Sequence, residues 1–162
     1  MPAPSLTWLE QKVPEFAQLP ERDKTEILDF SLLWSFFEGT ILNGHANLQS
    51  IRNYVQSLDN NGRLERINFN EYLAYVRDRY FKDGDYSEHF QYLYVERSGN
   101  PEEIPQMLQN QTDSKIVLLT GCLAIVFRLR NNLFHGEKWR YQLQDQYSNF
   151  NHANLLLIKL MS

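Results

Sequence analysis

The sequence predicts an all-α fold, a bundle of about five helices, on three observations. Its 162 residues are 43% hydrophobic and 22% charged, the composition of one globular domain that can bury a core without disulfides or a metal. Seven Gly and six Pro are too few for the turns of a many-stranded sandwich or barrel. The long apolar segments are bounded by helix start and stop signals, and no two segments form a convincing strand pair.

The first helix of the bundle is expected over residues 23–43. Residues 1–22, with four prolines, are expected to be a weakly structured lead-in, and residues 23–162 a single helical domain. Asp23 and Glu26 have the spacing of a capping box, and Asn43-Gly44 is a typical helix stop. Apolar residues lie nearly all round this helix, so we expect it to be central or to lie at a subunit contact.

Two further helices are expected in the middle of the chain. One covers residues 46–58, and another begins near Asn68 and Glu71, which again have capping-box spacing. Residues 82–85 (KDGD) break that helix. The apolar residues within 87–96 fit either a helix or a strand.

The C-terminal third contains the most apolar helix. Residues 100–103 (NPEE) have Pro and acidic residues where a short helix would begin. Asp113 is the expected N-cap of an apolar helix from 114 to about 131 or somewhat beyond, and a last helix is expected over 149–161.

Charge is distributed unevenly along the chain. The net charge is −4, which argues against a nucleic-acid binder covered in Lys and Arg. Residues 115–140, however, contain five Lys and Arg residues against one Glu, a local balance of +4 that leaves −8 for the remainder. This pattern favours a small anionic site over a long electrostatic groove.

The single cysteine and the N-terminus indicate a reducing cytoplasm. Cys122 cannot form an intrachain disulfide, and its apolar surroundings predict a buried, inert thiol. The N-terminus has no basic start followed by an apolar run, so no signal peptide is expected. The most apolar stretch, 116–127, is shorter than the ~20 residues of a membrane span, and no membrane association is expected.

The motif that carries chemistry is RNNLFH at residues 130–135, directly after the apolar helix. At ~100° per residue, Arg130 and His135 would lie ~140° apart around a straight helix. The two side chains can therefore meet on one phosphate only if the helix ends or distorts between them. Asn131-Asn132 and Gly136 tolerate such an ending, so the spacing predicts a site at a helix terminus.

Arginine and histidine together suit the cleavage of RNA. Arg130 would hold two phosphate oxygens with its planar fork, and His135 would transfer a proton near neutral pH. The RNA supplies its own nucleophile, the 2′-hydroxyl, so no metal or cofactor is required. Because cleavage needs both a base and an acid, a two-fold homodimer that joins two Arg130/His135 pairs would complete the site.

The motif resembles that of the HEPN superfamily of helical nucleotide-binding and RNA-cleaving domains. The family pattern is Arg, four to six residues, then His, commonly with Asn after the Arg, as Asn131 is here; Gly136 and Lys138 extend the likeness. The resemblance covers residues 23 to the C-terminus in helix layout. It implies a metal-independent endoribonuclease with a composite homodimer site, of the stand-alone prokaryotic type that serves as a toxin or in antiviral defence beside a neutralising or regulatory partner.

One position departs from part of the family. Some family toxins that pair with a nucleotidyltransferase carry a Tyr two residues after the His as a modification target. Glu137 stands there in this chain, so that form of control is not expected.

Three neighbours of the pair are candidate RNA contacts: Asn131, Lys138 and Arg128. The alternative for Lys138 and Arg128 is solvated surface. Asn131 could instead orient Arg130, or it could merely be a residue at the C-terminal end of the helix. Glu38 lies in an apolar stretch, where a carboxylate is costly unless it is paired. We expect either a pair with the motif Arg or another polar group, or simple exposure.

A non-catalytic function remains open beside the enzyme. Arg130 and His135 could merely cover the unpaired carbonyls of a helix C-terminus. The chain would then be a HEPN-like nucleotide-binding or protein-interaction module. No metal-ligand motif, phosphate-binding glycine loop or nucleophile elbow is present in the sequence, so metalloenzyme, kinase and serine-hydrolase functions are not expected.

Overall fold

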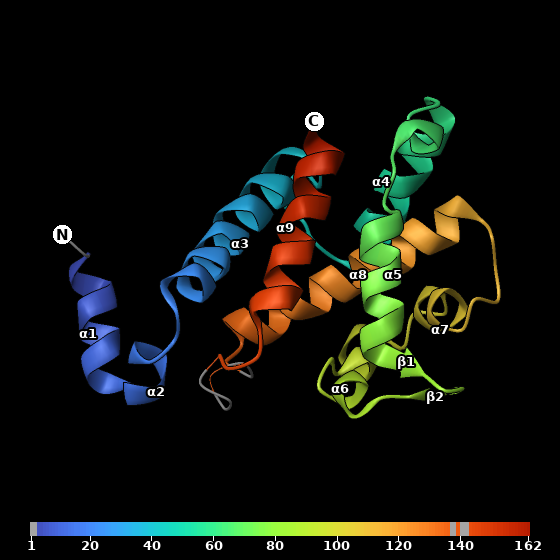
Figure 1. Cartoon of the computed structure of the whole chain (residues 1–162). Helices are drawn as coiled ribbons and strands as arrows, with labels where there is room; N and C mark the ends of the chain where they lie inside the picture. The colour runs from blue at the N-terminus through green and yellow to red at the C-terminus, as the bar shows by residue number, and fades with distance from the viewer. Residues whose placement is uncertain (1–2, 137–138, 140–142) are drawn as a thin grey trace.

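The computed structural model describes residues 3–136, 139 and 143–162 and is all-α, as predicted (Figure 1). Its only strands in this part of the chain are β1 (Phe81–Lys82) and β2 (Asp85–Tyr86), an antiparallel hairpin in which Phe81 pairs with Tyr86. The helices are α1 (Pro4–Lys12), α2 (Pro14–Ala17), α3 (Glu21–Thr40), α4 (Leu48–Asn60), α5 (Asn70–Tyr80), α6 (Glu88–Gln91), α7 (Glu103–Leu108), α8 (Lys115–Phe134) and α9 (Tyr147–Met161), with 3-10 turns η1 (Leu64–Arg66) and η2 (Val95–Ser98).

The central element is α8, drawn in orange in Figure 1. Helices α4 and α7 pack on it, while α3 and α9 lie side by side and α5 contacts both α8 and α9. Aromatic residues fill the contact between α3 and its neighbours: the Phe30 ring lies 4.8 Å from that of Phe150, and Trp34 stacks on Phe127. The long helices α3, α4, α5, α8 and α9 therefore make up the bundle.

By length and composition alone, helix α8 could cross a membrane. It is longer than the apolar stretch at residues 116–127 that the sequence indicated. However, 67% of the apolar window of α8 is buried inside the protein. The burial explains the composition of α8, because a helix that is apolar all round suits the centre of a bundle as well as it suits lipid.

The N-terminal segment was expected to be weakly structured, and this expectation was wrong. It forms α1 and α2, and Phe16 and Leu19 are buried in the core, although α1 itself buries no residue. The reason lies in the prolines, because Pro4 and Pro14 stand at the first helical positions. There the missing N–H costs nothing and the fixed φ favours a helix.

Several helix ends differ from the predicted caps by a few residues. Helix α3 begins after Pro20 with no side-chain cap, so the Asp23 capping box was wrong, and Ser114 rather than Asp113 caps α8. The stop at Asn43-Gly44 is confirmed, since both residues adopt the left-handed backbone conformation just after α3. The ambiguous residues 87–96 form short helical turns, α6 and the start of η2.

Candidate functional site

The RNNLFH segment lies at the C-terminal end of α8. The helix continues through both asparagines and ends at Phe134, so His135 is the first residue beyond it. The backbone N–H of His135 still donates to the carbonyl of Asn131 at 2.8 Å, and Gly136 follows with φ of 84°. The predicted placement at a helix terminus is confirmed, with the ending later than the asparagines.

Arg130 is held from three sides. Its Nη2 lies 3.7 Å from Oε2 of Glu38, its Nη1 donates to Oδ1 of Asn131 at 2.9 Å, and its guanidinium carbon lies 5.0 Å from the centre of the Phe134 ring. The side chain is 26% exposed. Its Nε is buried without a hydrogen-bond partner in the described part of the chain. The guanidinium is thus positioned while one of its donors is unused.

Glu38 is paired with Arg130, which was one of the two expectations for this carboxylate. The same Oε2 that faces Arg130 accepts a hydrogen bond from Nε1 of Trp34 at 2.8 Å. Trp34 is 1% exposed and stacks on Phe127 of α8, so its position is fixed by the core. The carboxylate is therefore anchored on α3 and faces the end of α8.

His135 is exposed beside this arrangement. Within residues 3–136, 139 and 143–162, no hydrogen bond or ion pair involves its imidazole. The ring can therefore meet solvent or a ligand, but nothing in the described chain orients it. One protomer brings an arginine and a histidine to the same helix end without joining them.

Arg128 does not lie at the surface, and the expectation that it contacts substrate is corrected. It is 3% exposed, and its guanidinium donates to the carbonyl of Leu93 at 2.9 Å, to Oγ of Ser98 at 3.0 Å and to Oδ1 of Asn132 at 2.9 Å. Asn132 in turn donates to the carbonyls of Tyr92 and Leu93. Buried polar groups must be paired, so Arg128 and Asn132 fasten α8 to the loop after α6.

The other candidates from the sequence have different outcomes. Asn131 accepts from Arg130, which supports an orienting role, whereas Lys138 lies outside the described residues. Cys122 is buried as predicted, and burial raises the pKa of its thiol far above the usual range. Among the described residues, no three His, Cys, Asp or Glu side chains gather as metal ligands would.

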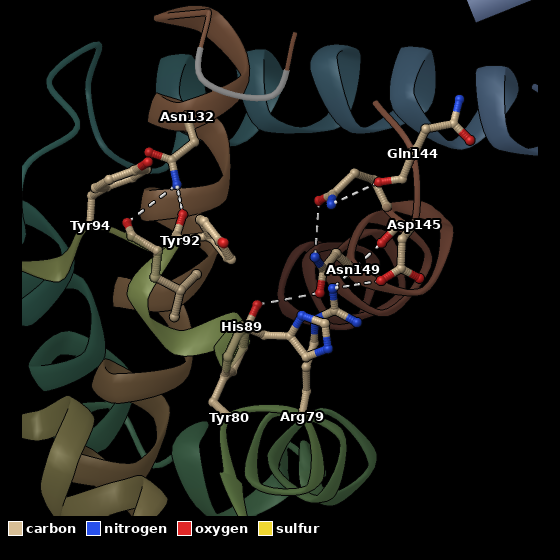
Figure 2. Close-up of a pocket in the computed structure, with 11 residues that line it drawn as sticks. Arg79, Tyr80, His89, Tyr92, Tyr94, Asn132, Gln144, Asp145 and Asn149 are labelled. Carbon is tan, nitrogen blue, oxygen red and sulfur yellow. Dashed lines mark hydrogen bonds and ion pairs between the residues drawn. The ribbon is translucent and has the colours of Figure 1, made fainter. Parts of the chain in front are cut away.

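A cavity that the sequence analysis missed lies near the same end of α8 (Figure 2). It encloses about 220 Å³, and its lining includes Arg79, Tyr80, His89, Tyr92 and Asn149. These residues come from α5, α6, the loop after α6 and α9, with no short motif to unite them. The available signal was the density of tyrosines between residues 80 and 94.

The chain was compared with protein-family models, with curated proteins and with solved structures, and none of them matches. The resemblance to the HEPN superfamily therefore remains a prediction from the motif.

Proposed function

We propose that this chain is a metal-independent endoribonuclease of the HEPN type, acting in the cytoplasm as a toxin or antiviral-defence component. The observation that carries the proposal is the end of α8. There Glu38 and Asn131 position Arg130, whose side chain is 26% exposed, and His135 stands exposed five residues further on.

The chemistry follows from the two side chains. Arg130 holds the scissile phosphate and stabilises the charge that builds on it in the transition state. His135 of one protomer removes the proton from the 2′-hydroxyl, and the O2′–P bond forms as the P–O5′ bond breaks. A second imidazole protonates the departing 5′ oxygen. The products are a 2′,3′-cyclic phosphate and a 5′-hydroxyl.

The second imidazole is that of another copy of the chain. The side chains of Leu28, Leu32 and Phe36 are spaced four residues apart on α3 and are 45%, 71% and 61% exposed. Such an apolar stripe is characteristic of an interaction surface. Helix α3 also carries Glu38, the partner of Arg130, so a dimer formed through α3 would use the helix that positions the arginine.

The dimer is tested by sedimentation. We expect the unsubstituted chain to sediment as a dimer and Leu32→Glu to sediment as a monomer without cleavage activity. Leu155→Glu is the matched control, because Leu155 is also an exposed leucine, 46% exposed, but lies on α9. A monomer that cleaves RNA would contradict the composite site.

The catalytic assignment is tested with structured RNAs in EDTA. Arg130→Ala and His135→Ala should each lower cleavage by roughly 10²–10⁴-fold, the usual contribution of a proton-transfer group. His45→Ala is the control, since His45 is an exposed histidine in the loop between α3 and α4. Cleavage at the unsubstituted rate by both motif variants would overturn the assignment.

The second candidate is a non-catalytic HEPN-like binding module. It is favoured by the absence of any hydrogen bond between Arg130 and His135 in the described residues of one protomer. A folded dimer that binds but does not cut RNA would support it. In either case, the proposal includes a neutralising or regulatory protein partner, which co-purification from the source cell would reveal.

A further inference from the structure

The cavity in Figure 2 is walled by aromatic rings from different elements. Tyr80 comes from the end of α5, His89 from α6, and Tyr92 and Tyr94 from the loop that follows. Its volume of about 220 Å³ lies below the roughly 300–1,000 Å³ of sites for drug-sized ligands. The space therefore suits one flat ring system rather than an extended molecule.

The opposite wall is a network of amides that is already in place. Oδ1 of Asn149 accepts from the hydroxyl of Tyr75 at 2.6 Å and from that of Tyr80 at 3.4 Å. Its Nδ2 donates to Oε1 of Gln146 at 3.1 Å, and Gln146 donates onward to the carbonyl of Gln144. The wall is rigid before any ligand arrives, which lowers the entropy lost on binding.

Arg79 supplies a cation with donors to spare. Its side chain is 14% exposed, and its Nε is buried without a hydrogen-bond partner in the described chain. Its Nη2 lies 3.5 Å from both the carbonyl oxygen and Oδ2 of Asp145, which is the upper limit of a hydrogen bond. The guanidinium also interacts with the hydroxyls of Tyr75 and Tyr80, but its buried, unpartnered Nε still favours a ligand that brings an acceptor oxygen or an anionic group.

One lining residue has an unusual backbone. Tyr94 has φ of 53° and ψ of 50°, in the left-handed region. Non-glycine residues other than Asn and Asp rarely adopt this conformation. Strain of this kind concentrates where a chain shapes a ligand site.

We propose that this cavity binds one unpaired nucleobase, stacked on Tyr92 and held by Arg79 through the attached phosphate or a base oxygen. Aromatic stacking beside a cation is the chemistry by which proteins hold single unpaired bases. Asn132 lines the cavity but, at ~100° per residue, lies about 200° around α8 from Arg130, so the base would be held on a different side of that helix from the guanidinium. Where the base belongs to RNA, the inference rests on the proposed function; a free mononucleotide would present the same chemistry.

Binding is measured by calorimetry with two ligands. The unsubstituted chain is titrated with each of the four ribonucleoside 5′-monophosphates up to about 1 mM, and the His135→Ala chain with short unpaired RNAs that it leaves uncut. Tyr92→Ala and Arg79→Gln should each weaken binding by about tenfold or more, whereas Tyr92→Phe should retain it. Tyr147→Ala is the control, because Tyr147 contacts Arg22 and does not line the cavity.

The two titrations distinguish whether the bound base belongs to RNA or to a free nucleotide. Tyr92-dependent binding of RNA alone assigns the cavity to the substrate, and Tyr92-dependent binding of monophosphates assigns it to a free nucleotide, even in a chain that cuts no RNA. Shifts of the side-chain amide signals of Asn132 and Gln146 would report occupancy without any substitution. The proposal is overturned if no ligand binds, or if Tyr92→Ala and Arg79→Gln leave binding unchanged in chains of native circular dichroism.

Discussion

At the scale of single residues, Glu38 controls how Arg130 is presented. The carboxylate is fixed by Trp34 and lies 3.7 Å from the guanidinium, and the two side chains are 22% and 26% exposed. A pair this shielded from water is screened less than a surface ion pair. Glu38 therefore acts as a positioning residue, which holds Arg130 near the end of α8.

Glu38→Gln tests this role. The amide oxygen can still accept from Trp34, but the attraction for Arg130 is lost. We expect kcat/KM to fall roughly fivefold, equivalent to about 1 kcal/mol. Glu65→Gln, which removes an exposed ion pair with Lys115, should leave it unchanged. Equal activity in all three chains would remove the positioning role.

Arg128 is expected to matter for stability rather than for RNA binding. Arg128→Gln removes the guanidinium donors to the carbonyl of Leu93, to Ser98 and to Asn132, and leaves Leu93 with only the bond from Asn132. The free energy of unfolding in urea should fall by roughly 2–4 kcal/mol. Arg22→Gln, at a side chain 69% exposed, should stay within about 0.5 kcal/mol of the unsubstituted chain. Weakened RNA binding at native stability would instead restore Arg128 as a substrate contact.

At the scale of elements, the contact between α7 and α8 depends on a missing side chain. A Cβ on Gly121 would lie 2.8 Å from the carbonyl oxygen of Glu103 and 3.0 Å from Cβ of Met107. Helix α7 therefore approaches the middle of α8 at a distance that only glycine permits.

Gly121→Ala and Gly39→Ala form a matched pair for this contact. Both glycines are helical, but a Cβ on Gly39 would meet nothing within 4 Å. Gly121→Ala should destabilise the protein by about 1–3 kcal/mol through overpacking. Gly39→Ala should stabilise it by up to about 1 kcal/mol, because alanine favours a helix. Thermal unfolding distinguishes them, and a stabilised Gly121→Ala chain would contradict the close approach.

Helices were predictable at this scale where their signals were local. The apolar segments of α3, α8 and α9 required a helix that buries them, and Asn43-Gly44 marked a real stop. The first residues of helices were less predictable. Asp113 and Ser114, for example, are neighbours and both good N-caps, and tertiary packing selects one of them. The prolines of the first 22 residues suggested weak structure, but a proline can begin a helix as well as end one, as Pro4 and Pro14 do.

At the scale of the whole molecule, the site is only partly encoded in a contiguous motif. RNNLFH placed Arg130 and His135 correctly at the end of α8. It could not show that Arg128, two residues earlier, turns inward, because burial depends on the loop that packs against it. The cavity has no motif, since Arg79 and Asn149 meet only after α5 and α9 have packed.

The buried tyrosines predict how the whole fold responds to alkali. Burial raises the pKa of Tyr80 to about 12, against about 10 in an unfolded chain. A raised folded-state pKa contributes stability that is complete below about pH 10 and is lost as the pH rises through about 12. The free energy of unfolding should therefore fall between these values, and Tyr80→Phe should make the fall shallower. Constant stability up to pH 12 would contradict the burial.

The most direct test of the account is the chemistry of the RNA ends. Purified chain and His135→Ala are incubated with structured RNA in EDTA, and the termini of the fragments are mapped. We expect 2′,3′-cyclic phosphate and 5′-hydroxyl ends from the unsubstituted chain and intact RNA from the variant. Fragments with 3′-hydroxyl and 5′-phosphate ends, or the same cuts by His135→Ala, would contradict it.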